Sequence, residues 1–490
     1  MKRIISIALA LTLALLQTAC QKSGGDTDTD NSGAKESTVQ PETVDYPDDL
    51  PEGLRFNGET VTFLYREEVA DEFCADTSNG DIVNDSIYDS FRSVEERLGV
   101  DIETIKRPGH LKAVRTEYVN YVKGSIMAGN DEFDWVDILI NSVPALLTEH
   151  IFKDLSENKY IDFDKPYYLE GLRDTLAIDG KLYLLSGDAS LGYLKSAFCI
   201  FFNRRLAEEY RLGDLYALVD SGDWTLEKLE ELSSAACQDL NNDGKFTLDD
   251  RLGFVVHDRN HTKGFIASTG TQMFTKSGGE WKFTYGSERD ADVCAKIYEL
   301  FFKTTGNYYG NVTNGDADPI YDLISAKFAS GEIFMMTAEL DDSVSQLRDM
   351  TDDFGILPYP KYDKSQENYY SSARTIHNSF LMPVTVKDED MAGAVMEALS
   401  CSNYMTVSPT YFETALKEKY SRDADSARMY DLIKGSMTLD FGYIYTNALN
   451  WPDTIFTGSC TSEDSFASNL AKIKVKCETC LEDFLEKMSS

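Results

Sequence analysis

The pattern of apolar positions is densest between residues 179 and 232. Lys181–Leu185 (KLYLL) is a short apolar run entered by the turn Asp179-Gly180, which predicts a strand. Ala197–Phe202 (AFCIFF) is nearly continuous in apolar residues and rich in aromatic ones. A run of this kind predicts a strand buried on both of its faces.

Helical spacing follows the second of these strands. A helix is expected over Arg204–Tyr210, and Leu226, Leu229 and Leu232 then recur every three residues along one face of another helix. Thr225 precedes that helix and has the side chain of an N-cap. The alternation of strands and helices predicts an α/β fold.

Further elements precede this stretch. Thr60–Tyr65 (TVTFLY) and Phe133–Ile140 predict strands, and Ile87, Phe91, Val94 and Leu98 form an apolar stripe that predicts a helix. At 490 residues the chain is too long for one typical core, so two lobes are expected.

The first residues have the layout of a secretory signal. Met1–Arg3 is basic and Ile4–Leu16 is apolar, too short to span a bilayer with margin. Ala19-Cys20 resembles the lipoprotein box, in which Cys20 is lipidated, although Gln17 departs from its usual leucine. Cleavage by ordinary signal peptidase with free secretion is the alternative. A hydrophilic stretch to Pro51 follows and predicts a disordered tether.

The order of three short motifs resembles a known family. Gly180-Lys181-Leu182-Tyr183, Phe202-Asn203-Arg204 and Trp224-Thr225 occur in the order and spacing of extracellular solute-binding proteins of carbohydrate-type ABC importers. The resemblance implies a two-lobe periplasmic-binding-protein-like α/β fold with three crossover segments, and a ligand in the cleft between the lobes. It also implies that Phe265–Thr275 approaches the cleft from the second lobe.

Later segments extend the resemblance. Phe328–Met336 is similar to a helix end turning into a strand, Phe354–Pro360 to the next strand, and His377–Pro383 to the second crossing. The implied organisation is a signal peptide (1–20), a tether (21–54), a first lobe (55–195 with 378–437) and a second lobe (198–374 with 440–490).

A twelve-residue loop in the second lobe has the spacing of an EF-hand calcium loop. Oxygen donors fall at positions 1, 3, 5, 9 and 12, glycine falls at position 6, and the residue at position 7 would offer its backbone carbonyl. The candidate ligands are Asp239, Asn241, Asp243, Lys245, Thr247 and Asp250. We expect one structural calcium ion that joins the Leu226 helix to a strand at Arg251–Val256; the alternative is a polar turn.

Candidate ligand contacts follow from positions at strand ends and crossings. Ligands of open α/β sheets bind beyond the carboxyl ends of strands, and polar or aromatic side chains there suit sugar hydroxyls and ring faces. The candidates are Arg66, Glu67, Asn141, Glu339, Asp440 and Tyr443. This set favours a neutral or weakly basic sugar over a phosphorylated one.

Composition and resemblance together give the expected function. The net charge of −36 argues against nucleic acid or an anionic lipid surface as a partner. We expect a monomeric, lipid-anchored protein on the outer face of the cell membrane. It has no enzymatic activity and delivers a carbohydrate to the permease subunits of an ABC transporter by lobe closure. A secreted polysaccharide hydrolase and the ligand-binding subunit of a sensor system are the alternatives.

Overall fold

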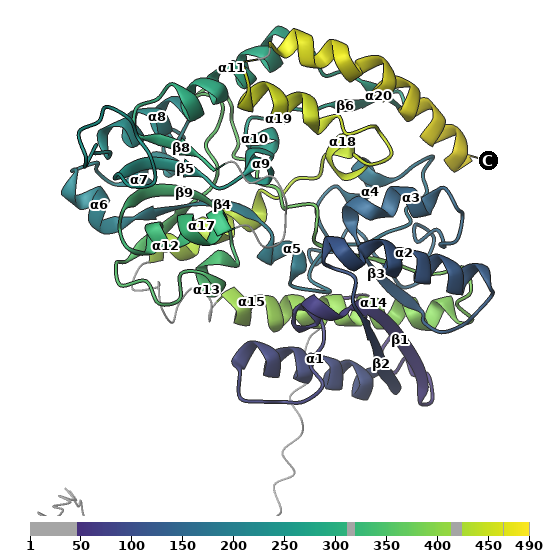
Figure 1. Ribbon diagram of the computed structural model, residues 1–490. Coiled ribbons are helices and arrows are strands. Elements are labelled where there is room, and N and C mark those ends of the chain that lie inside the picture. Colours follow the sequence, from purple (N-terminus) through teal and green to yellow (C-terminus); the bar gives the residue numbers. More distant parts are fainter. Residues whose placement is uncertain (1–46, 311–318, 413–423, 464, 490) are drawn as a thin grey trace, which may run out of the picture. The chain divides into compact units, whose positions relative to one another are not determined.

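The computed structural model describes residues 47–310, 319–412, 424–463 and 465–489. The signal segment, Cys20 and residues 21–46 of the expected tether lie outside these residues. The described strands form a four-stranded sheet, a five-stranded sheet and a two-stranded hairpin. Figure 1 shows the strands and helices with their labels.

The first sheet has the strand order β11-β3-β1-β2. Its strands are β1 (Glu59–Arg66), β2 (Val100–Arg107), β3 (Trp135–Leu139) and β11 (Asn378–Leu381). β1 runs parallel to β2 and β3, whereas β11 pairs antiparallel to β3. The strands predicted at Thr60–Tyr65 and Phe133–Ile140 are confirmed, and Trp135 is fully buried within β3.

The second sheet has the order β10-β4-β9-β5-β8. Its strands are β4 (Phe198–Asn203), β5 (Leu252–Val256), β8 (Asn307–Tyr309), β9 (Ile333–Glu339) and β10 (Phe354–Leu357). β4 pairs antiparallel to both neighbours, and every residue of β4 is buried, as its apolar sequence predicts. β6 (Phe274–Ser277) and β7 (Glu280–Phe283) form the hairpin.

The described helices connect and cover these sheets. They are η1 (Glu67–Glu72), α1 (Ile82–Leu98), α2 (Lys112–Met127), η2 (Ile140–Ser142), α3 (Val143–Leu147), α4 (Leu172–Leu176), α5 (Gly192–Lys195), α6 (Arg204–Glu209), α7 (Leu215–Asp220), α8 (Leu226–Ala235), α9 (Arg259–Thr262), α10 (Gly264–Ser268), α11 (Glu288–Phe302), α12 (Pro319–Ala329), α13 (Asp342–Ser345), α14 (Glu389–Met405), α15 (Val407–Phe412), α17 (Ala424–Gly435), α18 (Phe441–Ile444), α19 (Asp453–Thr461) and α20 (Phe466–Ser489). α14 and α15 contact α1, while α8 contacts β5 (Figure 1).

Local sequence signals explain where two of these helices begin and end. Asp81 caps α1 by accepting hydrogen bonds from two backbone amides, and Gly99 ends it at φ +61, a left-handed conformation that glycine adopts without strain. The predicted stripe of α1 is buried from Ile87 to Leu98. Thr225 caps α8 as predicted, with its hydroxyl accepting from the Lys228 amide at 3.3 Å.

Three chain segments run side by side where the sheets are joined. Ala197 forms a bridge with Ala373, and Ser371 forms one with Met437. The Phe198 amide donates to the Ser372 carbonyl at 2.9 Å, and the Thr438 amide donates to the Ser371 carbonyl at 2.8 Å. Three crossover segments are therefore present, as the resemblance implies, but the second lies at Ser371–Ala373 and not at His377–Pro383, where Asn378–Leu381 forms β11 of the first sheet.

Three expectations need correction. Leu182, Leu184 and Leu185 are buried, but Lys181–Leu185 makes only isolated bridges, with Leu185 facing Phe380, and it is not a strand because no neighbour extends the pairing. The expected tether ends too late in the chain. Asp48 already belongs to the folded part, because its carboxylate accepts hydrogen bonds from both terminal nitrogens of the Arg97 guanidinium, each at 2.6 Å. α17 contacts β10 of the second sheet, although residues up to 437 were assigned to the first lobe.

Candidate functional site

A cavity of about 290 Å³ lies where two of the crossing segments meet α10. Its lining residues are Lys263, Ile266, Ala267, Gly270, Thr271, Gln272, Tyr370, Ser372, Thr438, Leu439, Asp440 and Tyr443. The part of the wall from residue 266 to 272 belongs to the segment that the resemblance places near the cleft. A concave site with aromatic and polar walls suits a small organic ligand.

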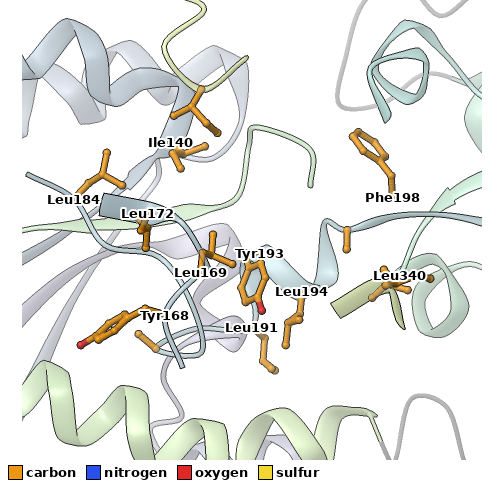
Figure 2. Packing of buried hydrophobic residues seen from close by; sticks show 14 of the residues in the cluster. Ile140, Tyr168, Leu169, Leu172, Leu184, Leu191, Tyr193, Leu194, Phe198 and Leu340 are labelled. Carbon is orange, nitrogen blue, oxygen red and sulfur yellow. The ribbon is translucent and has the colours of Figure 1, made fainter. Parts of the chain in front are cut away.

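A second, much smaller hollow adjoins this cavity. The two share Ser372, Thr438, Leu439 and Tyr443, so Tyr443 forms part of both walls. The smaller hollow is completed by other residues, among them Leu169 and Tyr193, which Figure 2 shows beside each other. The Tyr443 side chain therefore lies between the large cavity and the smaller hollow, whose wall includes Tyr193 of α5.

Two buried polar atoms of the shared wall have no hydrogen-bond partner among the described residues. They are the Ser372 hydroxyl and the Tyr443 hydroxyl, and both residues are at most 5% exposed. Burial raises the pKa of the Tyr443 phenol, so the hydroxyl keeps its proton and remains a donor; the Thr375 side chain, the nearest group that could bond to it, acts in the opposite direction. An unpaired buried polar group costs about 1–3 kcal/mol. A ligand hydroxyl at this wall would offset that cost.

The structure brings two predicted contacts, Asp440 and Tyr443, together in this cavity. Asp440 caps α18 by accepting from the Tyr443 amide at 2.7 Å, and burial raises the pKa of its carboxyl to about 6. The Asp440 carboxylate thus also shapes the turn that presents the Tyr443 ring.

Lys263 supplies a cation that the sequence did not reveal as part of the site. Its ammonium lies 2.8 Å from the buried Asp453 carboxylate and 5.8 Å from the centre of the Tyr443 ring. Because Asp453 balances this charge, the wall near Lys263 is electrostatically close to neutral.

Arg66 lies in a buried polar network outside the lining of the cavity. Its Nε is 2.6 Å from Asp137 Oδ2, and its Nη1 is 2.7 Å from Nδ1 of His110. Arg66 is the last residue of β1, as predicted. Its guanidinium, however, is bound by the Asp137 carboxylate on the neighbouring strand β3. Glu67, the next residue, is exposed at the start of η1. Their roles as ligand contacts stay predictions.

Glu339 and Asn141 are also outside the lining. Glu339 ends β9, lies 3.3 Å from Arg374 and 3.9 Å from Nε2 of buried His261, and burial raises its carboxyl pKa. The Asn141 carbonyl accepts a hydrogen bond from the Asn447 side chain. Contact of either residue with a ligand remains a prediction.

The predicted calcium loop has the backbone of a closed turn. Gly244 is at φ +76, and the backbone pairing of Gln238 with Arg251 closes the loop at its base. Asp239 accepts from the amides of Asn242 and Gly244, at 2.6 and 2.8 Å. These bonds turn the Asp239 carboxylate toward the interior of the loop.

The last ligand position of the loop is occupied by Asp250. Its carboxylate accepts from the amides of Leu240 and Thr247, at 3.0 and 2.9 Å. Within the described ranges, no three His, Cys, Asp or Glu side chains are gathered closely enough to hold a metal. The turn of the backbone and the oxygen atoms at the ligand positions suit calcium. In this structure, however, the Asp239 and Asp250 carboxylates accept hydrogen bonds from backbone amides of the loop. Calcium binding therefore stays a proposal.

Comparisons with known proteins inform the fold. Neither a scan against protein-family models nor a search of curated proteins finds a match. Solved structures do match over most of the chain.

Three of these structures illustrate the likeness. The cyclic α-maltosyl-1,6-maltose binding protein of Arthrobacter globiformis is 12% identical with a TM-score of 0.57, covering 87% of this chain and 99% of its own. The GacH receptor of Streptomyces glaucescens, solved with acarbose, is 13% identical with a TM-score of 0.54, with the same coverages. The galacto-N-biose-/lacto-N-biose I-binding protein of the Bifidobacterium longum ABC transporter is 12% identical with a TM-score of 0.53, covering 88% and 98%. The likeness confirms the two-lobe fold.

Proposed function

We propose that this protein is an extracellular solute-binding protein that delivers a carbohydrate to an ABC importer. The observation that carries the proposal is the cavity at the crossing segments, whose wall holds the buried hydroxyl of Tyr443 and that of Ser372, which has no partner among the described residues. Proteins of the same fold that bind sugars support it. In this function the chain catalyses no reaction, and ligand binding favours the closed arrangement of the lobes.

The cavity wall favours an uncharged or weakly basic sugar. The Lys263 ammonium is paired with Asp453, and the Asp440 carboxylate lies on the same wall. Recognition of a phosphate or carboxylate group relies on cations such as arginine, typically in bidentate contact. Sugar hydroxyls, in contrast, match the buried hydroxyls of Ser372 and Tyr443, and the Tyr443 ring offers a face for ring C–H groups.

Tyr443→Ala is expected to weaken sugar binding by about 1–3 kcal/mol, the scale of a lost buried aromatic face. A thermal-shift screen of neutral, amino and phosphorylated sugars first identifies a ligand, and titration calorimetry then measures its affinity. Tyr443→Phe keeps the ring and removes the hydroxyl, so it separates the two contributions. Tyr118→Phe is a matched control, because its buried hydroxyl donates to the Asp137 carbonyl away from the cavity. Wild-type affinity in Tyr443→Ala would show that other residues line the sugar site.

The proposed location is the outer face of the cell membrane, reached through a lipid on Cys20. Cys20 and the signal segment lie outside the described residues, so this rests on the sequence. The helices of the described ranges include none that is both long and apolar enough to cross a bilayer. The permease subunits of the transporter are the proposed partners, and the protein is proposed to act as a monomer.

Cys20→Ala is expected to release the protein from the membrane fraction. Cells fed labelled palmitate should label the wild type and leave the variant unlabelled, because the Cys20 thiol is the site of attachment. Cys480→Ala, at a cysteine near the other end of the chain, is the control and should remain labelled. An unlabelled wild type, released to the medium, would instead indicate cleavage by ordinary signal peptidase.

We also propose that the loop from Asp239 to Asp250 binds one structural calcium ion. It connects α8 with β5, so an ion held there would stabilise the packing of a helix against the second sheet. Its removal is expected to affect stability more than sugar recognition, because none of the six loop ligands lines the cavity.

A further inference from the structure

The short helix α5 is attached to a different sheet at each of its ends. At its start, the Leu191 amide donates to the Glu72 carbonyl at 2.9 Å, and Glu72 belongs to η1, directly after β1 of the first sheet. At its end, the Asp341 amide donates to the Lys195 carbonyl at 3.0 Å, and Asp341 follows β9 of the second sheet. On this one of the three crossings, a change in the angle between the sheets therefore acts on these four residues.

Apolar side chains from different parts of the chain lie at the two ends of α5. In Figure 2, Tyr193 lies beside Leu169, while Leu340 and Phe198 lie beyond the other end of the helix. Leu340 comes directly after β9, and Phe198 begins β4.

The side chain of Lys195 spans the same junction. Its ammonium lies 3.5 Å from Asp341, 3.6 Å from Glu72 and 3.5 Å from the more exposed Asp71. Burial acts to lower the pKa of Lys195, but the three carboxylates outweigh it and raise the pKa. One cation is therefore shared by carboxylates that follow strands of different sheets.

The surroundings of Lys195 leave little room for rearrangement. Tyr411 of α15 donates to Asp341 at 3.5 Å, and Arg66 and Asp137 are the next charges near Glu72. A Cβ on Gly192 would lie 2.6 Å from a Glu72 carboxylate oxygen and 2.5 Å from the Asn378 side-chain oxygen. A larger residue at this position would therefore have to displace the Glu72 and Asn378 side chains.

We propose that Lys195 is the positioning residue of the hinge, where its ammonium couples α5 to Glu72 on the first sheet and to Asp341 on the second. This deepens the proposed function, since it identifies what sets the angle of the cleft. When one lobe rotates, Lys195 must lengthen its contact with one carboxylate or the other. The hinge therefore has a preferred angle in the absence of ligand, and ligand binding acts against that preference.

The coupling is expected to depend on pH. Burial raises the pKa of Glu72 to about 7, an effect that Lys195 and Arg66 partly oppose. Above that pH the Glu72 carboxylate is charged and attracts Lys195; as pH falls through it, Glu72 becomes neutral and that attraction is lost. The contact with Asp341 remains, and on the side of η1 only the more exposed Asp71 is left, so the coupling of Lys195 to the first lobe weakens.

Hydrogen exchange of the ligand-free protein tests this proposal. In Lys195→Met, which keeps the length and removes the charge, peptides covering residues 189–199 and 338–343 should lose protection by about tenfold. Lys195→Arg should restore most of it. Wild-type protection factors at α5 should fall between pH 8 and pH 6, whereas those of Glu72→Gln should be low at both pH values.

Matched variants keep the result interpretable. Lys153→Met removes another partly buried lysine, 2.5 Å from Glu389, and should leave exchange at α5 unchanged. Should Lys195→Met unfold the protein, Asp341→Asn removes the second-sheet partner and should loosen the same peptides. Unchanged protection at α5 in both variants would overturn the proposal. Because the experiment uses no ligand, that outcome is independent of whether the protein binds a sugar.

Discussion

Asp137→Ala is expected to lower the free energy of unfolding by about 3–5 kcal/mol, because it leaves a buried guanidinium without its counter-ion. Asp137 is fully buried and Arg66 is 1% exposed. Two bonds hold the pair, Nε to Oδ2 at 2.6 Å and Nη2 to Oδ1 at 3.2 Å. The two residues lie on β1 and β3, the central strands of the first sheet.

Urea unfolding at neutral pH measures this loss. Asp76→Ala is the matched control, since Asp76 pairs with Lys106 on the surface and is 74% exposed; its loss should cost less than about 1 kcal/mol. The double variant Arg66→Met with Asp137→Leu should recover much of the stability, because removing both charges of a buried pair is often close to neutral. A small effect of Asp137→Ala would mean that His110 and the Ile376 carbonyl, the other partners of Arg66, suffice to hold the guanidinium.

Removal of calcium is expected to destabilise the protein by about 2–3 kcal/mol when the free ion exceeds its dissociation constant a hundredfold. The expectation follows from the donor spacing between Asp239 and Asp250 and from the turn at Gly244. Ion binding would redirect the carboxylates of Asp239 and Asp250 from loop amides to the metal. Thermal unfolding with and without EDTA is the measurement.

A residue within the same loop provides the control for calcium. Asp243→Ala removes a proposed ligand and should abolish the difference that EDTA makes. Asp249→Ala removes an exposed carboxylate at a position that is not a ligand in this loop pattern and should leave the difference intact. Identical melting curves with and without EDTA, together with an absence of calcium by elemental analysis, would contradict the proposal.

Local patterns in the sequence determined the secondary structure around the site. The apolar run that becomes β4, the stripe of α1 and the cap at Thr225 depend on residues close in the chain, and each is present as predicted. The run at Lys181–Leu185 has the same apolar character but is no strand, because a strand requires a neighbour along its whole length. The apolar sequence of this run indicated that its leucines would be buried. It did not indicate whether a neighbouring strand would pair with the run.

Asp440 and Tyr443 were predictable as site residues from their position at a crossing, whereas Lys263, Tyr370 and Ser372 join them only through the tertiary structure. No local motif marks Ser372 as a residue whose hydroxyl is buried without a partner. That property arises because two of the three crossing segments, which are distant in sequence, run side by side and meet α10. Arg66 shows the converse: its position at a strand end was predictable, but the carboxylate that holds it comes from a strand 71 residues later. Spacing along the chain specifies which groups a segment presents, and only the packing of distant segments decides whether a group meets its counter-ion or a cavity.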